Sequence, residues 1–265
     1  DESIERLHKF VSGGGAVLVS HHAGLSATKR DSWLAGYGLH YEGDSKFTPA
    51  YMVTEDGFAG EIPGYAYALY NGASQWRAES PARSLAMLGE PLFQRSAAHY
   101  TSHRQTPFSH VTGYTMLAVS GKVGLAAFPL GSSYYDKGYW IYRAAFMKLL
   151  DEIYPLRLIE SKASLNTEIT ITWQPADPEI KRRERYLVHL VNWSPTRKTP
   201  PHPEVHEDPV PLFEVPLKLN ISVENVKVTS ITGGLTLPHR IEGCGIEVTV
   251  PVVQVHEIVC FESTS

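Results

Sequence analysis

The residues best suited to chemistry form a short cluster in the first half of the chain. The run His99-Tyr100-Thr101-Ser102-His103-Arg104 gathers imidazole, phenol, hydroxyl and guanidinium groups, and His110 follows it. A second pair, His21-His22, directly follows a short apolar run. In open parallel sheets ligands gather outside the carboxyl ends of strands, so this pair lies where a ligand would bind. The alternative is that these side chains pack a subunit interface or satisfy loop carbonyls.

The spacing of His99 and His103 raises the question of a metal site. Residues four apart lie on one face of a helix, which suits two zinc ligands. The intervening Thr101 and Ser102, and Pro107 beyond them, do not favour a stable helix. We therefore expect no metal ion and no cofactor here.

Other signatures of catalysis do not occur. The sequence has no Gly-Lys-Ser/Thr phosphate loop and no G-x-S-x-G elbow, and Gly13-Gly14-Gly15 precedes a predicted strand instead of a helix. These absences argue against nucleotide binding and against a serine hydrolase triad.

The composition is that of a folded chain without a charged partner. Of the 265 residues, 43% are hydrophobic and 20% are charged, and the formal net charge is -4. The basic run Lys181-Arg182-Arg183 is short and flanked by glutamates, so we expect no nucleic acid partner. No run approaches the ~20 apolar residues of a membrane helix, so we expect a soluble chain and no membrane partner. Cys244 and Cys260 could meet across neighbouring strands, but two thiols fix neither a disulfide nor the compartment.

The elements that must position the histidines begin with a helix and a strand. Ile4, Leu7, Phe10 and Val11 recur at helical spacing, the glycines of SGGG end that helix, and AVLVS follows as a buried strand. This order is typical of an αβ unit in a parallel sheet. Since no strand precedes the helix, we expect the first strand of that sheet to belong to a longer parent chain.

The rest of the first half predicts loops, strands and one long helix. Residues 21–70 are rich in Gly, Tyr and Asp and predict loops with short strands. Two strand-like runs follow, SLAMLGEPLF and TMLAVSGKVGLAAFPL, the second broken by a hairpin turn at Gly121. The apolar face of residues 139–154 predicts a helix that Pro155 ends. We expect residues 1–157 to form a truncated α/β domain with a parallel sheet in three layers.

The second half changes to strand periodicity. Six runs alternate apolar and polar residues, namely EITITWQ, RYLVHLVNW, LKLNISV, VKVTSI, IEVTVPV and HEIVCFE. Such a series predicts a small β-sandwich over residues 158–265. Between the second and third runs lies a proline-rich segment that predicts an exposed, stiff loop.

The order of several blocks resembles the C-terminal part of glycoside-hydrolase-like proteins. The blocks are GGGAVLVS, HYTSHRQTP, AAFPLGSSYYDKGYWIYR, LLDEIYP, YLVHLVNWSP and VPVVQVHEIVCFE. In those proteins a (β/α)8 barrel precedes a β-galactosidase trimerisation-type domain and a C-terminal β-domain. The resemblance implies a flavodoxin-like or amidotransferase-like first domain that mediates oligomer contacts. That domain has no cysteine here, which excludes amidotransferase nucleophile chemistry from it.

The resemblance also bears on which residues we expect in a functional site. Glycoside hydrolysis needs two carboxyl groups across a sugar, and the barrel that would carry them is missing from this chain. The carboxylates of the second half fit solvated surface positions, so we nominate no catalytic pair: Glu160, Glu168, Glu204, Glu207 and Asp208. We expect exposed loop aromatics to stack on sugar faces. The substrate-facing candidates are His21, His22, His99, Tyr100, His103, Arg104, Tyr134 and Tyr135.

These expectations combine into one function and two alternatives. The first is an accessory region that holds a glycoside hydrolase as a homo-oligomer and supports the active site of its own barrel, which binds a carbohydrate substrate. The second is a carbohydrate-binding module. The third is a small enzyme that uses the His99 to Arg104 cluster. Neither the sugar nor the oligomer number follows from the sequence.

Overall fold

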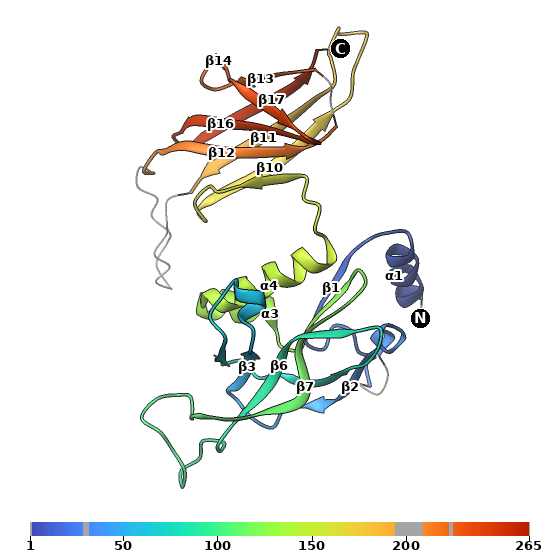
Figure 1. Ribbon diagram of the computed structural model, residues 1–265, viewed down its shortest axis with the longest axis vertical. Helices are drawn as coiled ribbons and strands as arrows, with labels where there is room; N and C mark the ends of the chain where they lie inside the picture. The colour runs from blue at the N-terminus through green and yellow to red at the C-terminus, as the bar shows by residue number, and fades with distance from the viewer. Residues whose placement is uncertain (1, 29–31, 194–208, 223–224, 265) are drawn as a thin grey trace. The chain divides into compact units, whose positions relative to one another are not determined.

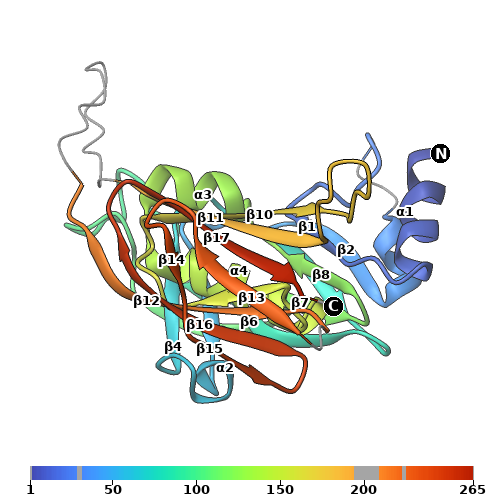
Figure 2. The same ribbon diagram turned by 90° about the horizontal axis from the view of Figure 1, so that it is seen from above.

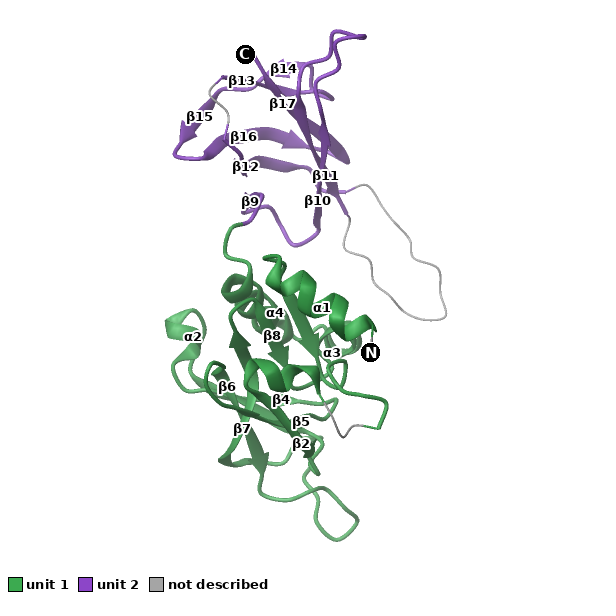
Figure 3. Cartoon of the chain, turned by 90° about the vertical axis from the view of Figure 1, so that its right-hand side faces the viewer, with its two compact units in different colours: residues 1–156 green, residues 157–265 purple. Residues whose placement is uncertain are grey.

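The chain folds as two compact units, Asp1–Leu156 and Arg157–Ser265 (Figure 3). The structure is a computed structural model that describes residues 2–28, 32–193, 209–222 and 225–264. Each unit has its own cluster of buried apolar side chains. In the described residues no helix is both long and apolar enough to cross a membrane.

Unit 1 contains a curled, mostly antiparallel sheet with helices before and after it (Figure 1). Its elements are α1 (Glu2–Ser12), β1 (Val17–Ser20), η1 (Trp33–Tyr37), β2 (Leu39–Asp44), β3 (Ala50–Thr54), α2 (Gly57–Gly60), β4 (Tyr65–Leu69), β5 (Ser74–Ala78), β6 (Arg83–Pro91), β7 (Phe108–Ser120), β8 (Val123–Ala126), α3 (Leu130–Lys137) and α4 (Trp140–Ile153). The predicted N-terminal helix, the first strand and the long helix are confirmed as α1, β1 and α4. The predicted hairpin joins β7 to β8.

The predicted parallel sheet is wrong in its main part. The strand order is β1-β8-β7-β6-β3-β4, with β2 paired to β5 and β5 paired to β7. Among the described strands only β1 and β8 pair in parallel, and the other pairs are antiparallel. The reason lies in the connections. Two residues, Gly121 and Lys122, join β7 to β8, and such a short turn allows only antiparallel pairing, whereas parallel strands need a long crossover. The α/β expectation therefore holds at one edge of the sheet.

The core of unit 1 lies between this sheet and its C-terminal helix. Trp76, Phe128 and Tyr142 are fully buried there. Burial of each such side chain contributes about 1.5–3 kcal/mol. Gly124 of β8 faces Leu149 and Ile153 of α4, so the helix packs closely on the parallel strand pair. This packing fixes the carboxyl end of β1, where His21 and His22 lie.

Unit 2 is the predicted β-sandwich. Its strands are β9 (Ile159–Ser161), β10 (Thr167–Gln174), β11 (Arg185–Asn192), β12 (Leu212–Asn220), β13 (Val226–Ser230), β14 (Leu235–Thr236), β15 (His239–Glu242), β16 (Gly245–Val253) and β17 (His256–Ser263). One antiparallel sheet has the order β10-β11-β17-β13-β14 and the other β15-β16-β12-β9 (Figure 2). Inward side chains of both sheets form a single apolar cluster. The six predicted strands are confirmed, and β9, β14 and β15 are additional.

Two further expectations concern unit 2. Residues 194–208 of the proline-rich segment, with Glu204, Glu207 and Asp208, lie outside the described residues. Cys244 is exposed, Cys260 is buried, and both are free thiols. The open question of a disulfide is therefore settled against one in this structure.

Candidate functional site

An aromatic cleft of about 1020 Å³ runs beside the edge strand of unit 1. It is lined by residues of β3 and β4, the segment that joins β6 to β7, and the start of α4. Its aromatic lining is Tyr51, Tyr65, Tyr67, Tyr70, Phe108 and Tyr139, and its polar lining includes Glu55, Thr101, His103 and Gln105. Rings beside a few hydrogen-bonding groups are typical of a site that binds an organic ligand.

The sequence of β4 explains why rings gather there. β4 is an edge strand of the sheet, and residues from both of its faces line the cleft. Tyr65 and Tyr67 alternate with alanines, which places both phenol rings on one face of the strand. Their ring centroids are 5.7 Å apart, and Tyr67 also contacts Trp140 edge to face at 5.6 Å. Tyr65 is 68% exposed, so its ring is available to a ligand.

Two tyrosines hold the segment with the predicted histidine cluster against this cleft. The Tyr51 hydroxyl donates to the Thr106 carbonyl, and the Tyr70 hydroxyl donates to Gln105 Oε1 at 2.6 Å. The Arg104 guanidinium lies 5.8 Å from the centroid of the Tyr70 ring, within cation–π range. His103, which directly precedes these anchored residues, lines the cleft.

The residues of the predicted cluster at 99–104 therefore fall into two groups. His103 lines the cleft and Arg104 lies against its Tyr70, whereas His99 and Tyr100 are not among the lining residues. The His99 ring lies 5.9 Å from the Phe93 ring, and Tyr100 is exposed. No helix forms over residues 99–104.

The other predicted pair, His21-His22, is at the carboxyl end of β1, away from the lining of the cleft. The two imidazole rings stack with centroids 3.6 Å apart. His22 Nε2 lies 2.5 Å from Asp44 Oδ1, and the Tyr41 hydroxyl donates to the same oxygen at 3.0 Å. Burial, followed by the hydrogen bond to Asp44 and its charge, raises the pKa of Tyr41 to about 12. The phenol is therefore a donor at neutral pH.

Tyr134 and Tyr135 do not lie in a loop, contrary to the prediction. Both are part of helix α3 and are exposed, Tyr135 by 80%. The helix ends at Gly138, whose φ of 57° is favourable only for glycine and whose N–H donates to the Tyr134 carbonyl. Gly138 is the signal in the sequence that a helix ends there.

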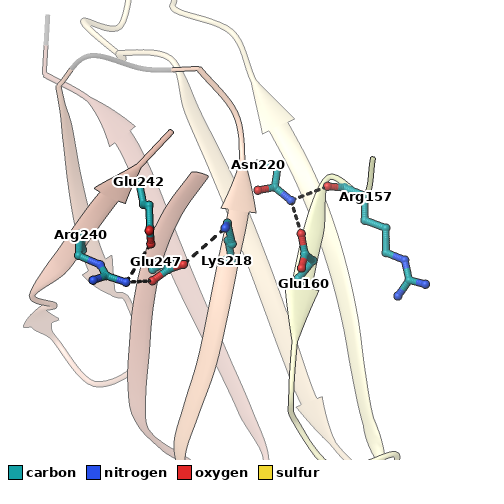
Figure 4. Close-up of polar contacts among 7 residues, drawn as sticks. All are labelled: Arg157, Glu160, Lys218, Asn220, Arg240, Glu242 and Glu247. Atoms are coloured by element: carbon teal, nitrogen blue, oxygen red, sulfur yellow. Dashed lines mark hydrogen bonds and ion pairs between the residues drawn. The ribbon is translucent and has the colours of Figure 1, made fainter. Parts of the chain in front are cut away.

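Unit 2 has a groove of about 870 Å³ on the four-stranded sheet. Arg240, Glu247, Lys218 and Glu160 are register partners across β15, β16, β12 and β9, with alternating charge (Figure 4). Arg240 Nη2 donates to Glu247 at 2.8 Å, and Lys218 Nζ lies 3.5 Å from that carboxylate. The hydrogen bond from Arg240 holds the pKa of Glu247 below its usual range.

Each charged side chain of this row has a polar partner. Asn220 donates to Glu160 Oε1 at 2.7 Å and to the Arg157 carbonyl at 2.8 Å, which completes the row at β9 (Figure 4). The described residues that line the groove include no tyrosine, tryptophan or phenylalanine. Cross-strand ion pairs of this kind stabilise a sheet, so the groove is a scaffold feature and the cleft of unit 1 is the stronger candidate site.

Comparison with known proteins bears on the fold. The sequence matches no protein-family model, and no curated protein matches it. Alpha-L-fucosidase isoenzyme 2 from Paenibacillus thiaminolyticus has a similar structure, with a TM-score of 0.87 and 24% sequence identity. The fold of this chain is therefore also that of one part of the fucosidase. The match covers 99% of this chain and 39% of the fucosidase chain.

Sequence reasoning missed most of the aromatic cleft and the partners of His22. Residues 21–70 were interpreted mainly as loops, yet they supply Tyr41, Asp44, Tyr51, Tyr65 and Tyr67. The usable signal was the alternation in YAYAL, which is a strand pattern with tyrosine on one face. No local pattern in the sequence predicts that Asp44 contacts His22, because this contact depends on the pairing of β2 with β5.

Proposed function

We propose that this chain is the accessory region of a glycoside hydrolase. The similarity to part of an α-L-fucosidase, over 99% of this chain and 39% of that one, is the observation that carries the proposal. Neither unit is a (β/α)8 barrel, so the two catalytic carboxylates would come from another part of the same enzyme. In this proposal unit 1 is the trimerisation-type domain and unit 2 is its supporting sandwich.

The cleft of unit 1 has the groups through which an accessory region could contact a sugar. Sugars present apolar C–H faces and a ring of hydroxyls, which suit the tyrosine rings and the hydrogen-bonding groups of the cleft. Tyr65 supplies an exposed ring, and His103 and Gln105 supply polar groups beside it. We propose that the cleft faces the sugar site of the barrel, of the same chain or of a neighbouring subunit.

Turnover with and without this region tests the proposal. The full gene product and the chain alone are assayed on a panel of nitrophenyl glycosides. We expect turnover by the full product, a large loss when residues 1–265 are deleted, and no turnover by the chain alone. Full activity of the deletion product would contradict an accessory role. Turnover by the chain alone, abolished by His103→Ala, would instead support a small enzyme that uses the histidine cluster.

The oligomer is tested separately. Light scattering of the chain across a concentration range is expected to give a dimer or a cyclic trimer. The exposed aromatics Tyr134 and Tyr135 on α3 are candidates for such a contact, and Tyr135→Ser is expected to shift the equilibrium toward monomer. A strictly monomeric chain would contradict the oligomerisation role.

A carbohydrate-binding module remains the second candidate, and the same cleft favours it. Tyrosine rings beside polar groups would hold a glycan without any catalytic partner. Calorimetric titration of the chain with mono- and oligosaccharides distinguishes the two. Binding by the isolated chain that Tyr65→Ala removes would support the module, whereas binding that requires the barrel would support the accessory role.

A further inference from the structure

Four side chains converge at the carboxyl end of β1, away from the lining of the aromatic cleft. In a regular strand consecutive side chains point to opposite faces. His21 has a φ of 53°, which turns the chain out of β1 and brings its imidazole over that of His22. Non-glycine residues seldom adopt this conformation. The turn thus presents two imidazoles on one side of the chain.

A second backbone irregularity brings a carboxylate to the same place. Tyr41 and Asp44 are three positions apart and would face opposite sides of an uninterrupted strand. The pairing of β2 with β5 shifts register between Tyr41 and Gly43, and Gly43 takes a φ of 142°. This bulge puts the Tyr41 hydroxyl within hydrogen-bond distance of the Asp44 carboxylate. Asp44 in turn contacts His22.

We propose that His21, His22 and Asp44 bind a divalent transition-metal cation of the zinc type. One potential ligand atom from each of the three side chains lies within 4.8 Å of the others. Two imidazoles and one carboxylate form a set that zinc accepts, with a fourth position left for water. Imidazole nitrogen favours zinc, copper and nickel over calcium or magnesium, which prefer oxygen ligands.

Binding requires a small local rearrangement. The stacked rings turn apart about their side-chain torsions so that both lone pairs point to one ion. The cation takes the place of any proton between His22 Nε2 and Asp44 Oδ1, and that proton leaves to solvent. The side chain of His22 is 28% exposed and that of Asp44 is 47% exposed, so a hydrated ion can reach both.

Tyr41 fits the role of a positioning residue for this site. Its hydroxyl donates to Asp44 Oδ1 and its ring contacts Trp76 of the core at 5.3 Å, so it holds the carboxylate on a rigid support. Such outer partners orient metal ligands, and their removal typically weakens metal affinity about 10–100-fold. The cation would join β1, which pairs with β8, to β2, which pairs with β5. It would thus link two strands that share no backbone ladder.

Cobalt and zinc are the probes that test this site, and the test does not depend on the proposed function. The full chain is treated with chelator and titrated with Co²⁺, followed by Zn²⁺. We expect one Co²⁺ per chain with visible absorption bands, displaced by Zn²⁺. His22→Ala and Asp44→Asn should weaken binding by more than about tenfold, and Tyr41→Phe by about tenfold. His110→Ala is the matched control, since His110 also lies near a carboxylate, that of Glu90 at 4.0 Å.

A stability measurement covers the case in which a variant binds poorly because it folds poorly. Zn²⁺ should raise the thermal midpoint of wild-type unit 1 and of His110→Ala, and should not raise that of the isosteric Asp44→Asn. Absence of Co²⁺ bands in the wild type would overturn the proposal and leave a hydrogen-bonded cluster. Equal binding by wild type and Asp44→Asn would overturn it as well, because the ion would then sit on other histidines.

Discussion

The two units use β-sheets in different ways. In unit 1 two strand pairs, β2–β5 and β6–β7, have register shifts, and the edge strand β4 carries the exposed ring of Tyr65. In unit 2 the long β10–β11 ladder runs unbroken from Thr167 to Gln174, and a row of alternating charges crosses the four-stranded sheet. The register shift in unit 1 brings unlike side chains together at one place, whereas the regular strand pairing of unit 2 places opposite charges side by side. This difference is why we propose the cleft of unit 1, and not the groove of unit 2, as the candidate site.

Core truncations should produce the largest effects and should separate the units. Trp76 is fully buried in unit 1 and donates from Nε1 to Ser74 Oγ at 2.8 Å, and Phe261 is 1% exposed in unit 2. Each alanine substitution is expected to lower the free energy of unfolding by about 3–5 kcal/mol. By scanning calorimetry, Trp76→Ala should shift only the transition of unit 1 and Phe261→Ala only that of unit 2. Equal shifts of both transitions would contradict two separate cores.

A buried carboxylate of unit 2 should have the next largest effect. Glu257 is 5% exposed and accepts hydrogen bonds from the backbone N–H groups of Thr232 at 3.1 Å and Ile258 at 2.9 Å. Glu257→Ala leaves two amides unpaired and is expected to cost about 1–3 kcal/mol in urea unfolding. The comparison is Glu242→Ala, which removes an exposed ion pair with Arg240 and should cost less than about 1 kcal/mol. Equal costs would show that burial does not set the difference.

The pH dependence compares one ion pair in each unit. Hydrogen bonds from Arg77 lower the pKa of Glu42 in unit 1, and a hydrogen bond from Arg240 lowers that of Glu247 in unit 2, both from an ordinary value of 4.5. A carboxyl whose pKa is lower in the folded state stabilises the fold above pH 4.5 and loses this effect as the pH falls through the folded-state value. Glu42 is exposed and Glu247 is half-buried, and solvent screens both ion pairs, so the effects are small.

Glutamine variants assign this effect to a unit. Denaturation is followed between pH 7 and pH 3 in wild type, Glu42→Gln and Glu247→Gln. We expect Glu42→Gln to flatten the acid limb of unit 1 alone, and Glu247→Gln that of unit 2 alone. Unchanged acid limbs in both variants would mean that solvent screens these pairs completely.

Regular elements could be predicted from the sequence because their signals are local. The alternation in EITITWQ and HEIVCFE and the apolar face of residues 139–154 each lie within one segment, and the structure confirms them as β10, β17 and α4. The predicted strand direction in the sheet of unit 1 was wrong. Strand direction depends on which strands pair, and the paired strands lie far apart in the sequence. The parallel order expected from the first helix and strand holds only for β1 and β8.

The candidate site was predictable only in part for the same reason. His103 and His22 could be nominated from their residue types, but Asp44 and the tyrosines of the cleft lie far away from them in the sequence. The Tyr51 hydroxyl reaches the Thr106 carbonyl, and Asp44 reaches His22, through strand pairings that no local pattern encodes. The sequence predicts a loop at Tyr134 and Tyr135 because Gly131 and the two serines after it have low helix propensity, although they begin α3.

The most direct test of the account compares the cleft of unit 1 with the groove of unit 2 in one assay. The full gene product is measured as kcat/KM on its best nitrophenyl glycoside, with Tyr65→Ala and His103→Ala in the cleft and Lys218→Ala in the groove. The account predicts a loss of about tenfold or more for each cleft variant, the size expected from one lost ligand contact, and near wild-type activity for Lys218→Ala. Full activity of both cleft variants, or a loss confined to Lys218→Ala, would contradict it.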